Sequence, residues 1–225
     1  MGATKKADNN GGALNLSIIQ GTFMQKSDKD NPEAVKREYE DKDGNTKFKY
    51  EVHYKNVDGL IYSVEFKDGD FGEQCIITLV DAGENIKIYI PTDSRYFTDF
   101  AKKLPNIDLT SYVEFMPYDF EGDNGKQVKG LSVKQNGEKI YSHYYDADKK
   151  KTINGLPQPD KDWKTEWDKD DWKMFFIKER KFLKKKVQEV EFSEVVPSTE
   201  PKKAPKPRAK AEQAVADDSD DDLPF

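Results

Sequence analysis

Apolar and polar residues alternate along short stretches of this chain, and this alternation constrains the fold more than any other feature. The clearest case is residues 48–55, where an aromatic or aliphatic side chain occupies every second position. Successive side chains of a strand point to opposite faces, so such a stretch builds a strand with one buried face. Asn-Gly pairs at 124–125 and 136–137 are strong signals for tight hairpin turns. The sequence therefore predicts a mainly β fold.

The same pattern predicts strands over residues 14–23, 48–54, 60–66, 74–80, 85–90, 111–120, 127–135 and 139–145. Turn residues Asp58-Gly59 predict that the second and third of these strands form a hairpin. Residues 82–84 predict another hairpin between the fourth and fifth strands. Between the first and second strands, residues 25–46 are charged and read as a long loop, whose composition also allows a short helix near residues 32–38.

Two segments have helical periodicity instead. Residues 94–104 place apolar side chains at helical spacing between Pro91 and Pro105, which limit the helix at both ends. Residues 171–190 combine an apolar stripe with a strongly cationic face. That face admits three interpretations: a solvated surface, part of a path for nucleic acid, or one side of a helix that packs on the β domain or on a second subunit.

The order of elements is strands, one central helix, then strands again. This order fits an OB-type small barrel with extra hairpin strands, and it also fits other small barrels and sandwiches. The sequence predicts a disordered N-terminus (1–12) and then an OB-type nucleic-acid-binding domain (13–150). A linker with the amphipathic basic helix (151–192), a flexible tether (193–216) and an acidic partner-binding tip (217–225) follow.

Soft metal ligands and targeting signals are scarce. The chain has one cysteine, Cys75, and two histidines, His53 and His143, which leaves no internal disulfide and too few ligands for a zinc site. Its start lacks the apolar run of a signal peptide, and no stretch reaches the roughly 18 apolar residues of a membrane span. We expect a soluble, cytoplasmic protein without a metal or other cofactor and without a membrane partner.

No catalytic pattern is present either. The sequence has no glycine-rich phosphate loop, no histidine pair on a helix and no nucleophile elbow. Asp70-Phe71-Gly72 spells a kinase motif, but no catalytic-loop His-Arg-Asp accompanies it, so we read a turn. We therefore expect a protein that is not an enzyme. A nuclease would need a carboxylate cluster that holds Mg²⁺, and the sequence does not indicate one.

Charge is distributed unevenly around a net value of −6. Residues 212–225 carry six acids and no base, and residues 201–210 carry five bases and no acid, so residues 1–200 have a net charge of −5. A nucleic acid would therefore have to bind through local basic patches and aromatic stacking.

Residues 217–225 are five aspartates around one serine, followed by Leu223, Pro224 and Phe225. Such a segment cannot fold alone, because it has little to bury and its charges repel one another. Solubility alone would explain the aspartates, but it does not explain an apolar end. A basic pocket with an apolar slot could bind this tip.

The terminal residues Asp-Asp-Leu-Pro-Phe resemble the acidic tip of single-stranded DNA-binding proteins of bacteria and bacteriophages, and the length favours the bacteriophage type. That resemblance implies an OB fold, sequence-tolerant binding of single strands in DNA replication, recombination and repair, and action in the host cytoplasm. It also implies recruitment of replication and recombination proteins through Asp220, Asp221, Asp222, Leu223, Pro224 and Phe225. Oligomers are compatible with this interpretation.

For DNA contacts we select lysines and tyrosines on the predicted strands, because lysines bind phosphates and aromatic rings stack on bases. They are Lys47, Lys49, Tyr50, Tyr54, Tyr62, Lys87, Tyr89 and Lys134. Lys87 and Tyr89 are the sharpest pair, because the isoleucines that alternate with them occupy the core face. The tyrosines also have a purely structural interpretation, in which they fill the core.

Tethered by residues 193–216, the aspartates could reach the DNA groove and mimic phosphates until a strand displaces them. An alternative function is a replisome adaptor that docks through the tip and does not bind DNA.

Overall fold

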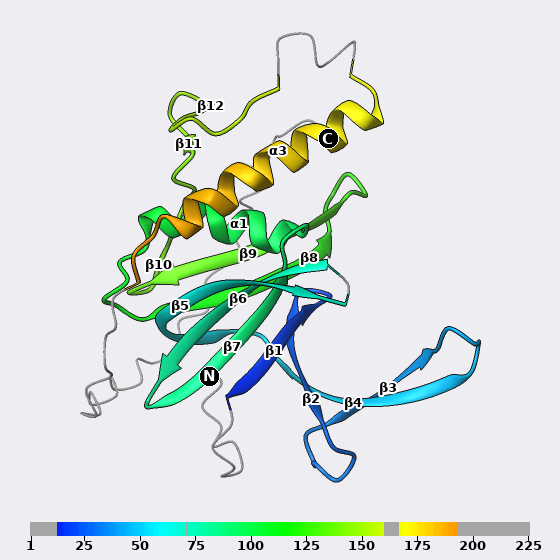
Figure 1. Cartoon of the computed structure of the whole chain (residues 1–225). Helices are drawn as coiled ribbons and strands as arrows, with labels where there is room; N and C mark the ends of the chain where they lie inside the picture. Colours follow the sequence, from blue (N-terminus) through cyan, green and yellow to red (C-terminus); the bar gives the residue numbers. More distant parts are fainter. Residues whose placement is uncertain (1–12, 71, 160–166, 193–225) are drawn as a thin grey trace.

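A computed structural model describes residues 13–70, 72–159 and 167–192 of the 225-residue chain (Figure 1). The predicted N-terminal segment, the tether 193–216 and the acidic tip 217–225 lie outside the described residues, as does part of the linker at 160–166. The described part is mainly β, as the alternation predicts.

Ten strands form one large sheet. They are β1 (Leu14–Ile19), β2 (Thr22–Ser27), β3 (Val35–Glu40), β4 (Thr46–Tyr54), β5 (Val57–Gly69), β6 (Gly72–Asp81), β7 (Glu84–Pro91), β8 (Val113–Glu121), β9 (Gln127–Gln135) and β10 (Glu138–Lys139). The spatial order is β10-β9-β8-β5-β6-β7-β1-β2-β4-β3. Neighbouring strands whose pairing is defined run antiparallel except β1 and β7, which are parallel.

The remaining elements cover or flank this sheet. They are α1 (Arg95–Lys103), the 3₁₀ helix η1 (Leu104–Asn106), the small hairpin β11 (Tyr145–Asp146) and β12 (Lys151–Thr152), and α3 (Lys169–Gln188). Figure 1 shows α1 lying over the sheet and α3 lying across α1.

The sheet curls until the β1–β2 turn meets β8. Gly21 in that turn has φ +72°, and a Cβ built on it would lie 2.4 Å from the backbone nitrogen of Asp119 in β8. Its N–H also donates to the Tyr96 hydroxyl of α1, at 3.3 Å. Within the described residues, however, no strand ladder closes the sheet into a barrel.

Aromatic rings of α1 fill the inside of the curl. Phe97 and Phe100 are fully buried. Their rings make edge-to-face contacts with Phe66 of β5 and Phe115 of β8, each at a centroid distance of 5.9 Å. The helix begins at Ser94, whose hydroxyl accepts the N–H of Phe97, and it ends before Pro105, as the sequence predicts.

Helix α3 is seated on α1 by its C-terminal half. Leu183 and Val187 are buried, and Lys102 of α1 forms an ion pair with Glu179 at 3.0 Å. At its start, Asp168 accepts the N–H groups of the first turn in a capping box. The helix thus packs on the β domain, where its buried contacts come from Leu183 and Val187, whereas Phe176 of the predicted apolar stripe is 42% exposed. Contact of the cationic face with nucleic acid stays a prediction. The rings of Trp172 and Phe176 pack against each other.

Strands β3 and β4 form a two-stranded hairpin that projects from the body, which we call the β3–β4 arm (residues 35–54) (Figure 1). Its aromatic and aliphatic side chains are less covered than those of the body. Phe48 is 48% exposed and Val35 is 61% exposed.

Strand and helix positions agree with the sequence at most places. The predicted β6–β7 hairpin is confirmed, and its turn residues Ala82 and Gly83 both have positive φ. Helix α3 matches the predicted helix at 171–190 within two residues at each end.

Four local predictions are wrong. Residues 14–23 are not one strand, because β1 ends at Ile19 and β2 begins at Thr22 after a turn at residues 20–21. Residues 35–40 form β3, where the composition allowed a short helix near 32–38. Strands β4 and β5 are not a hairpin, because β4 pairs with β2 and β3 while β5 pairs with β6 and β8. In residues 139–145 only the two ends are in strands, because Lys139 belongs to β10 and Tyr145 to β11.

The contact at Gly21 yields a stability prediction. Gly21→Ala should lower the free energy of unfolding by at least about 3 kcal/mol, because it adds a backbone clash to the cost of a left-handed residue. Gly44→Ala is the matched control, since Gly44 has φ +78° with nothing within 4 Å of the added Cβ. It should cost about 1 kcal/mol. Equal losses in urea unfolding would contradict the packing of the β1–β2 turn on β8.

Candidate nucleic-acid interface

Strand alternation gives the sheet a second face, turned away from the core. On β7, Ile86, Ile88 and Ile90 are buried inside, so Lys87 and Tyr89 point outward and are half-buried. Parallel pairing places Asn15 of β1 beside Lys87 and Ser17 beside Tyr89. The face continues across β2 and β4 onto the β3–β4 arm.

We call this surface the outer face. By strand register it includes the exposed, apolar Val35 and twelve further side chains: Asn15, Ser17, Met24, Lys26, Arg37, Tyr39, Lys47, Lys49, Glu51, His53, Lys87 and Tyr89. Five of the twelve are lysine or arginine and one is acidic, so the face is cationic although the chain is not.

A hollow lies in the outer face where β1, β2 and β7 meet. Its volume is about 400 Å³, and it is lined by Ala13, Asn15, Ser17, Met24, Gln25, Lys26 and Tyr89. The Tyr89 hydroxyl donates to Asn15 Oδ1 at 3.1 Å. In turn, Asn15 Nδ2 donates to the carbonyl oxygen of Ala13 at 2.9 Å. These two bonds hold the Tyr89 ring in a defined orientation beside the hollow.

On the arm, the outer face is organised by one buried carboxylate. Glu51 is fully buried, and its Oε1 accepts two hydrogen bonds from Arg37, at 3.1 and 2.9 Å. Oε2 lies 3.4 Å from Nε2 of His53 and has no hydrogen bond within the described residues. His53 is fixed by a contact of 3.1 Å between its Nδ1 and Thr22 Oγ1. A buried charge must be paired, so Glu51 holds Arg37 in place.

The lysines of the arm are partly committed to neighbours. Lys47 forms an ion pair with Asp41 at 2.7 Å, and this hydrogen bond holds the pKa of Asp41 below its usual range. The Lys49 ammonium lies 4.2 Å from the centre of the Tyr39 ring, a cation–π contact on the outer face. Both side chains still border solvent, so a phosphate can approach them.

Four of the eight predicted contact residues share the outer face: Lys47, Lys49, Lys87 and Tyr89. The other four lie elsewhere. Tyr50 and Tyr54 point to the opposite face of β4, because residues of even number alternate with Lys49 and Glu51 there.

Tyr54, Tyr62 and Lys134 lie in three different surroundings. Tyr54 packs against the core and donates from its hydroxyl to Gln25 at 2.8 Å, and burial raises its pKa. Tyr62 lies at the bulge in β5 and is 41% exposed. Lys134 is on β9, paired with Glu114 of β8, with three strands between β9 and β7.

Sequence reasoning missed the remaining members, above all Asn15, Lys26, Arg37 and Tyr39. Arg37 and Tyr39 belong to β3, whose run of charged residues contains no hydrophobic alternation to announce a strand. Asn15 was within a predicted strand, but only the parallel pairing with β7 brings it to Tyr89. The predicted partner-binding residues 220–225 lie outside the described residues.

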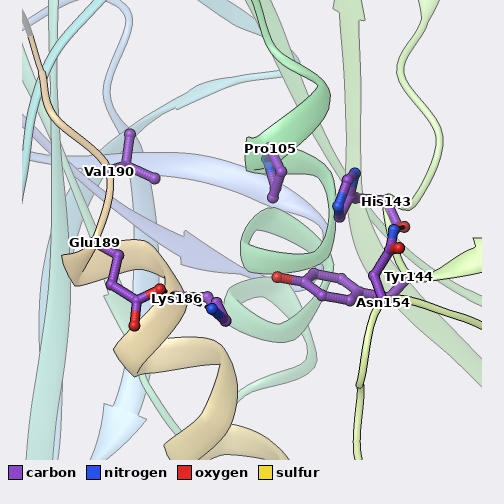
Figure 2. A pocket seen from close by; sticks show the side chains of 7 residues that line it. All are labelled: Pro105, His143, Tyr144, Asn154, Lys186, Glu189 and Val190. Carbon is purple, nitrogen blue, oxygen red and sulfur yellow. Dashed lines mark hydrogen bonds and ion pairs between the residues drawn. The ribbon is translucent and has the colours of Figure 1, made fainter.

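A second hollow, of about 260 Å³, lies under the end of α3 and is shown in Figure 2. It is lined by Pro105, His143, Tyr144, Asn154, Lys186, Glu189 and Val190. Lys186 and Glu189 form an ion pair at 2.7 Å, which raises the pKa of the lysine and lowers that of the glutamate. Asn154 Nδ2 donates to the His143 carbonyl. These polar groups of the hollow are thus paired with one another or with the backbone. We interpret the hollow as part of the contact between the end of α3 and residues 143–154.

Other kinds of site find no support in the described ranges. There, no group of three or more histidine, cysteine, aspartate or glutamate residues is arranged to hold a metal ion. Burial raises the pKa of Cys75 to about 12, so its thiol stays neutral. None of the helices described is long and apolar enough to span a membrane.

Comparison of the chain with protein-family models, with curated proteins and with solved structures found no match.

The ion pair under the arm can be tested by stability measurements. Arg37→Ala should lower the free energy of unfolding by about 3 kcal/mol, because it leaves the fully buried carboxylate of Glu51 without its hydrogen-bonded partner. Glu65→Ala is the control: it removes an exposed ion pair with Lys67, and should cost less than about 1 kcal/mol. In the double variant Arg37→Ala/Glu51→Ala, the second substitution should add little. Additive losses would show that the two residues do not support each other.

Proposed function

We propose that this chain is a single-stranded DNA-binding protein that coats exposed strands in DNA replication, recombination and repair. The observation that carries the proposal is the outer face, where Tyr89 is held by Asn15, follows Lys87 on the same side of β7 and lines a hollow together with Lys26. This face continues onto the cationic arm. Single-strand binders combine a positively charged track for phosphates with aromatic platforms for bases, and this face offers both.

The strand order supports an OB-type assignment. Strands β5, β6 and β7 form a meander, α1 follows, and β8 returns to pair with the start of β5. In an OB fold the second and third strands of the barrel form the face that binds oligonucleotides. Here these strands are β6 and β7, and β7 carries Lys87 and Tyr89. Strand β1 lies parallel to β7, and the β1–β2 turn meets β8 at Gly21. Strand β1 therefore occupies the opening between β7 and β8 that a closing strand of a barrel would occupy.

The mechanism follows from this placement. One base stacks on the Tyr89 ring over the hollow, and lysines of β2, β4 and β7 neutralise phosphates on either side. Stacking on one aromatic side chain contributes about 1–3 kcal/mol, and the lysine contacts release counterions, so affinity falls as salt rises. Neither contact reads a base edge, so binding tolerates any sequence.

The acidic tip extends the proposal to partners. A terminal Phe225 with three preceding aspartates, on a tether of 24 residues, suits a partner pocket that combines basic side chains with an apolar slot. We propose that Asp220, Asp221, Asp222, Leu223, Pro224 and Phe225 recruit replication and recombination proteins. In the bound protein the tip is free for them, because the strand occupies the cationic face that the aspartates could otherwise contact.

A second candidate is a replisome adaptor that uses the tip but does not bind DNA. The net charge of −5 over residues 1–200 favours it. Titration of the full chain with oligo-dT in dilute buffer separates the two functions, since an adaptor gives no change in intrinsic fluorescence and a strand binder gives saturable quenching.

Substitution of Tyr89 tests the stacking platform. Tyr89→Ala should raise the Kd for oligo-dT by about 5- to 100-fold, because the ring is lost, whereas Tyr89→Phe retains the ring and should bind within a few-fold of the parent. Tyr145→Ala removes another exposed ring, on β11, and serves as control. Fluorescence anisotropy at one fixed salt concentration gives the values. An affinity that is unchanged by Tyr89→Ala would rule out this face as the strand site.

Removal of residues 217–225 tests the tip. The truncated chain should bind oligo-dT more tightly at low salt, because five aspartates no longer compete with phosphates, and the difference should vanish at high salt. It should also fail to retain replication proteins of its host in a pull-down, and Phe225→Ala should fail there with DNA affinity intact. If neither quantity changes, the tip has no part in the mechanism.

A further inference from the structure

Helix α3 carries a row of lysines that the proposed strand site does not use. Lys178, Lys181 and Lys185 follow one another at spacings of three and four residues, so they lie on one side of the helix, and all three are exposed. They face away from Leu183 and Val187, which are buried against the body.

None of these three lysines has an ion-pair partner within the part of the chain that is described, whereas several neighbouring cationic side chains are held by other groups. Lys184 is paired with Glu73 of β6, Lys186 with Glu189, and the Arg180 Nε–H donates to the Phe176 carbonyl. On the outer face, Lys47 and Arg37 also have acidic partners. Lys185 attracts the Glu189 carboxylate and helps to lower its pKa, yet no ion pair within the described residues holds any of the three lysines. The row is therefore a second cationic surface open to solvent.

The position of the row is fixed by the core. Buried Leu183 and Val187, the ion pair of Glu179 with Lys102, and the edge-to-face contact of Phe182 with Tyr144 at 5.7 Å hold the helix on α1. The helix cannot rotate without breaking them, so the lysines are presented outward at all times. Figure 1 shows α3 above α1, on the side of the body away from β1, β2 and the β3–β4 arm.

We propose that this lysine row binds a second single strand, so that one molecule holds two strands and accelerates the annealing of complementary sequences. The inference rests on the proposed function of the outer face. The row lies on the side of the body away from β1, β2 and the arm, so a short strand bound along β7 and the arm would leave it open to another strand.

The chemistry of the row suits phosphates and little else of a nucleic acid. Each lysine is a compact charge with three donors that imposes no direction on its partner. No ring lies among the three, so contact is by phosphate alone, independent of sequence and weak. Three such contacts should contribute a slope of about −2 to the dependence of log K on log salt, since single strands give about −0.7 for each phosphate neutralised. Weak binding lets the strand leave once it has paired.

The test measures annealing and strand affinity separately in the full chain. Two complementary labelled oligonucleotides are mixed with the protein, and the rate of duplex formation is followed by energy transfer. Lys178→Glu/Lys181→Glu/Lys185→Glu should slow annealing by about tenfold or more at low salt, with the Kd for oligo-dT within twofold of the parent. Replacement of the same three lysines by arginine should restore annealing.

A matched control separates the row from overall charge. Lys202→Glu/Lys203→Glu/Lys206→Glu changes the net charge equally and should anneal like the parent. The inference is overturned if the α3 variant anneals at the parental rate, or if it loses oligo-dT affinity and annealing together, since the row would then belong to the path of one strand. It is also overturned if zero-length cross-linking joins the row to Asp217–Asp222 and annealing is unaffected, because the tail is then the occupant. A parent chain that ignores oligo-dT would instead refute the proposed function.

Discussion

The burial of α1 inside the curled sheet is the constraint on which the rest of the structure depends. Phe97 and Phe100 are fully enclosed, and each contributes about 2–3 kcal/mol of hydrophobic free energy. Because these rings occupy the inner side of the sheet, each strand must turn its apolar side chains inward and the alternate side chains outward. This requirement fixes the register of the strands. A shift of one residue in β7 would exchange Ile88 for Tyr89 and destroy the core and the outer face together.

The two parts of the outer face therefore have different physical origins. Around Tyr89 the backbone is held by the core beneath it, and only the hydroxyl bond to Asn15 is needed to set the ring. The β3–β4 arm has little core of its own, as the exposure of Phe48 shows. Its shape depends on cross-strand pairs, of which the buried Glu51 with Arg37 is the strongest candidate. We expect the arm to be the part that adapts to a strand, and the β7 region to be the part that positions it.

How far the sequence predicts this arrangement depends on which residues are considered. Lys87 and Tyr89 were placed correctly, because three isoleucines alternate with them and state unambiguously which face is buried. On β4 the same alternation places Tyr50 and Tyr54 on the face opposite Lys47 and Lys49, as the structure has it. On β4 the aromatic residues are on the face continuous with the core, while fully buried Glu51 lies on the cationic side. Alternation alone cannot say which face of such a strand is used.

Pairing between distant strands was the other limit. The Asp58-Gly59 signal suggested a hairpin, but β4 and β5 turn to different neighbours, and only the tertiary curl decides this. Strand β3 escaped prediction because its residues are almost all charged, as suits an edge strand that must not aggregate. The alternation of apolar and polar residues also does not predict whether the outer face binds DNA. The sequence supplied lysines and tyrosines, and the fold decided which of them meet.

The acidic net charge of the chain does not oppose strand binding, because charges act over a short range in salt. The Debye length is about 8 Å at physiological ionic strength, so a phosphate on the outer face responds to the lysines within that distance and hardly to acids across the body. In the proposed function the five aspartates of residues 217–222 act differently, because a flexible tether would let them approach a cationic face or leave it. They would then act as a competing anion at high local concentration. We expect this competition to be strongest in dilute salt and weakest once a partner holds the tip, so that partner binding and strand binding would support each other without any change in the fold.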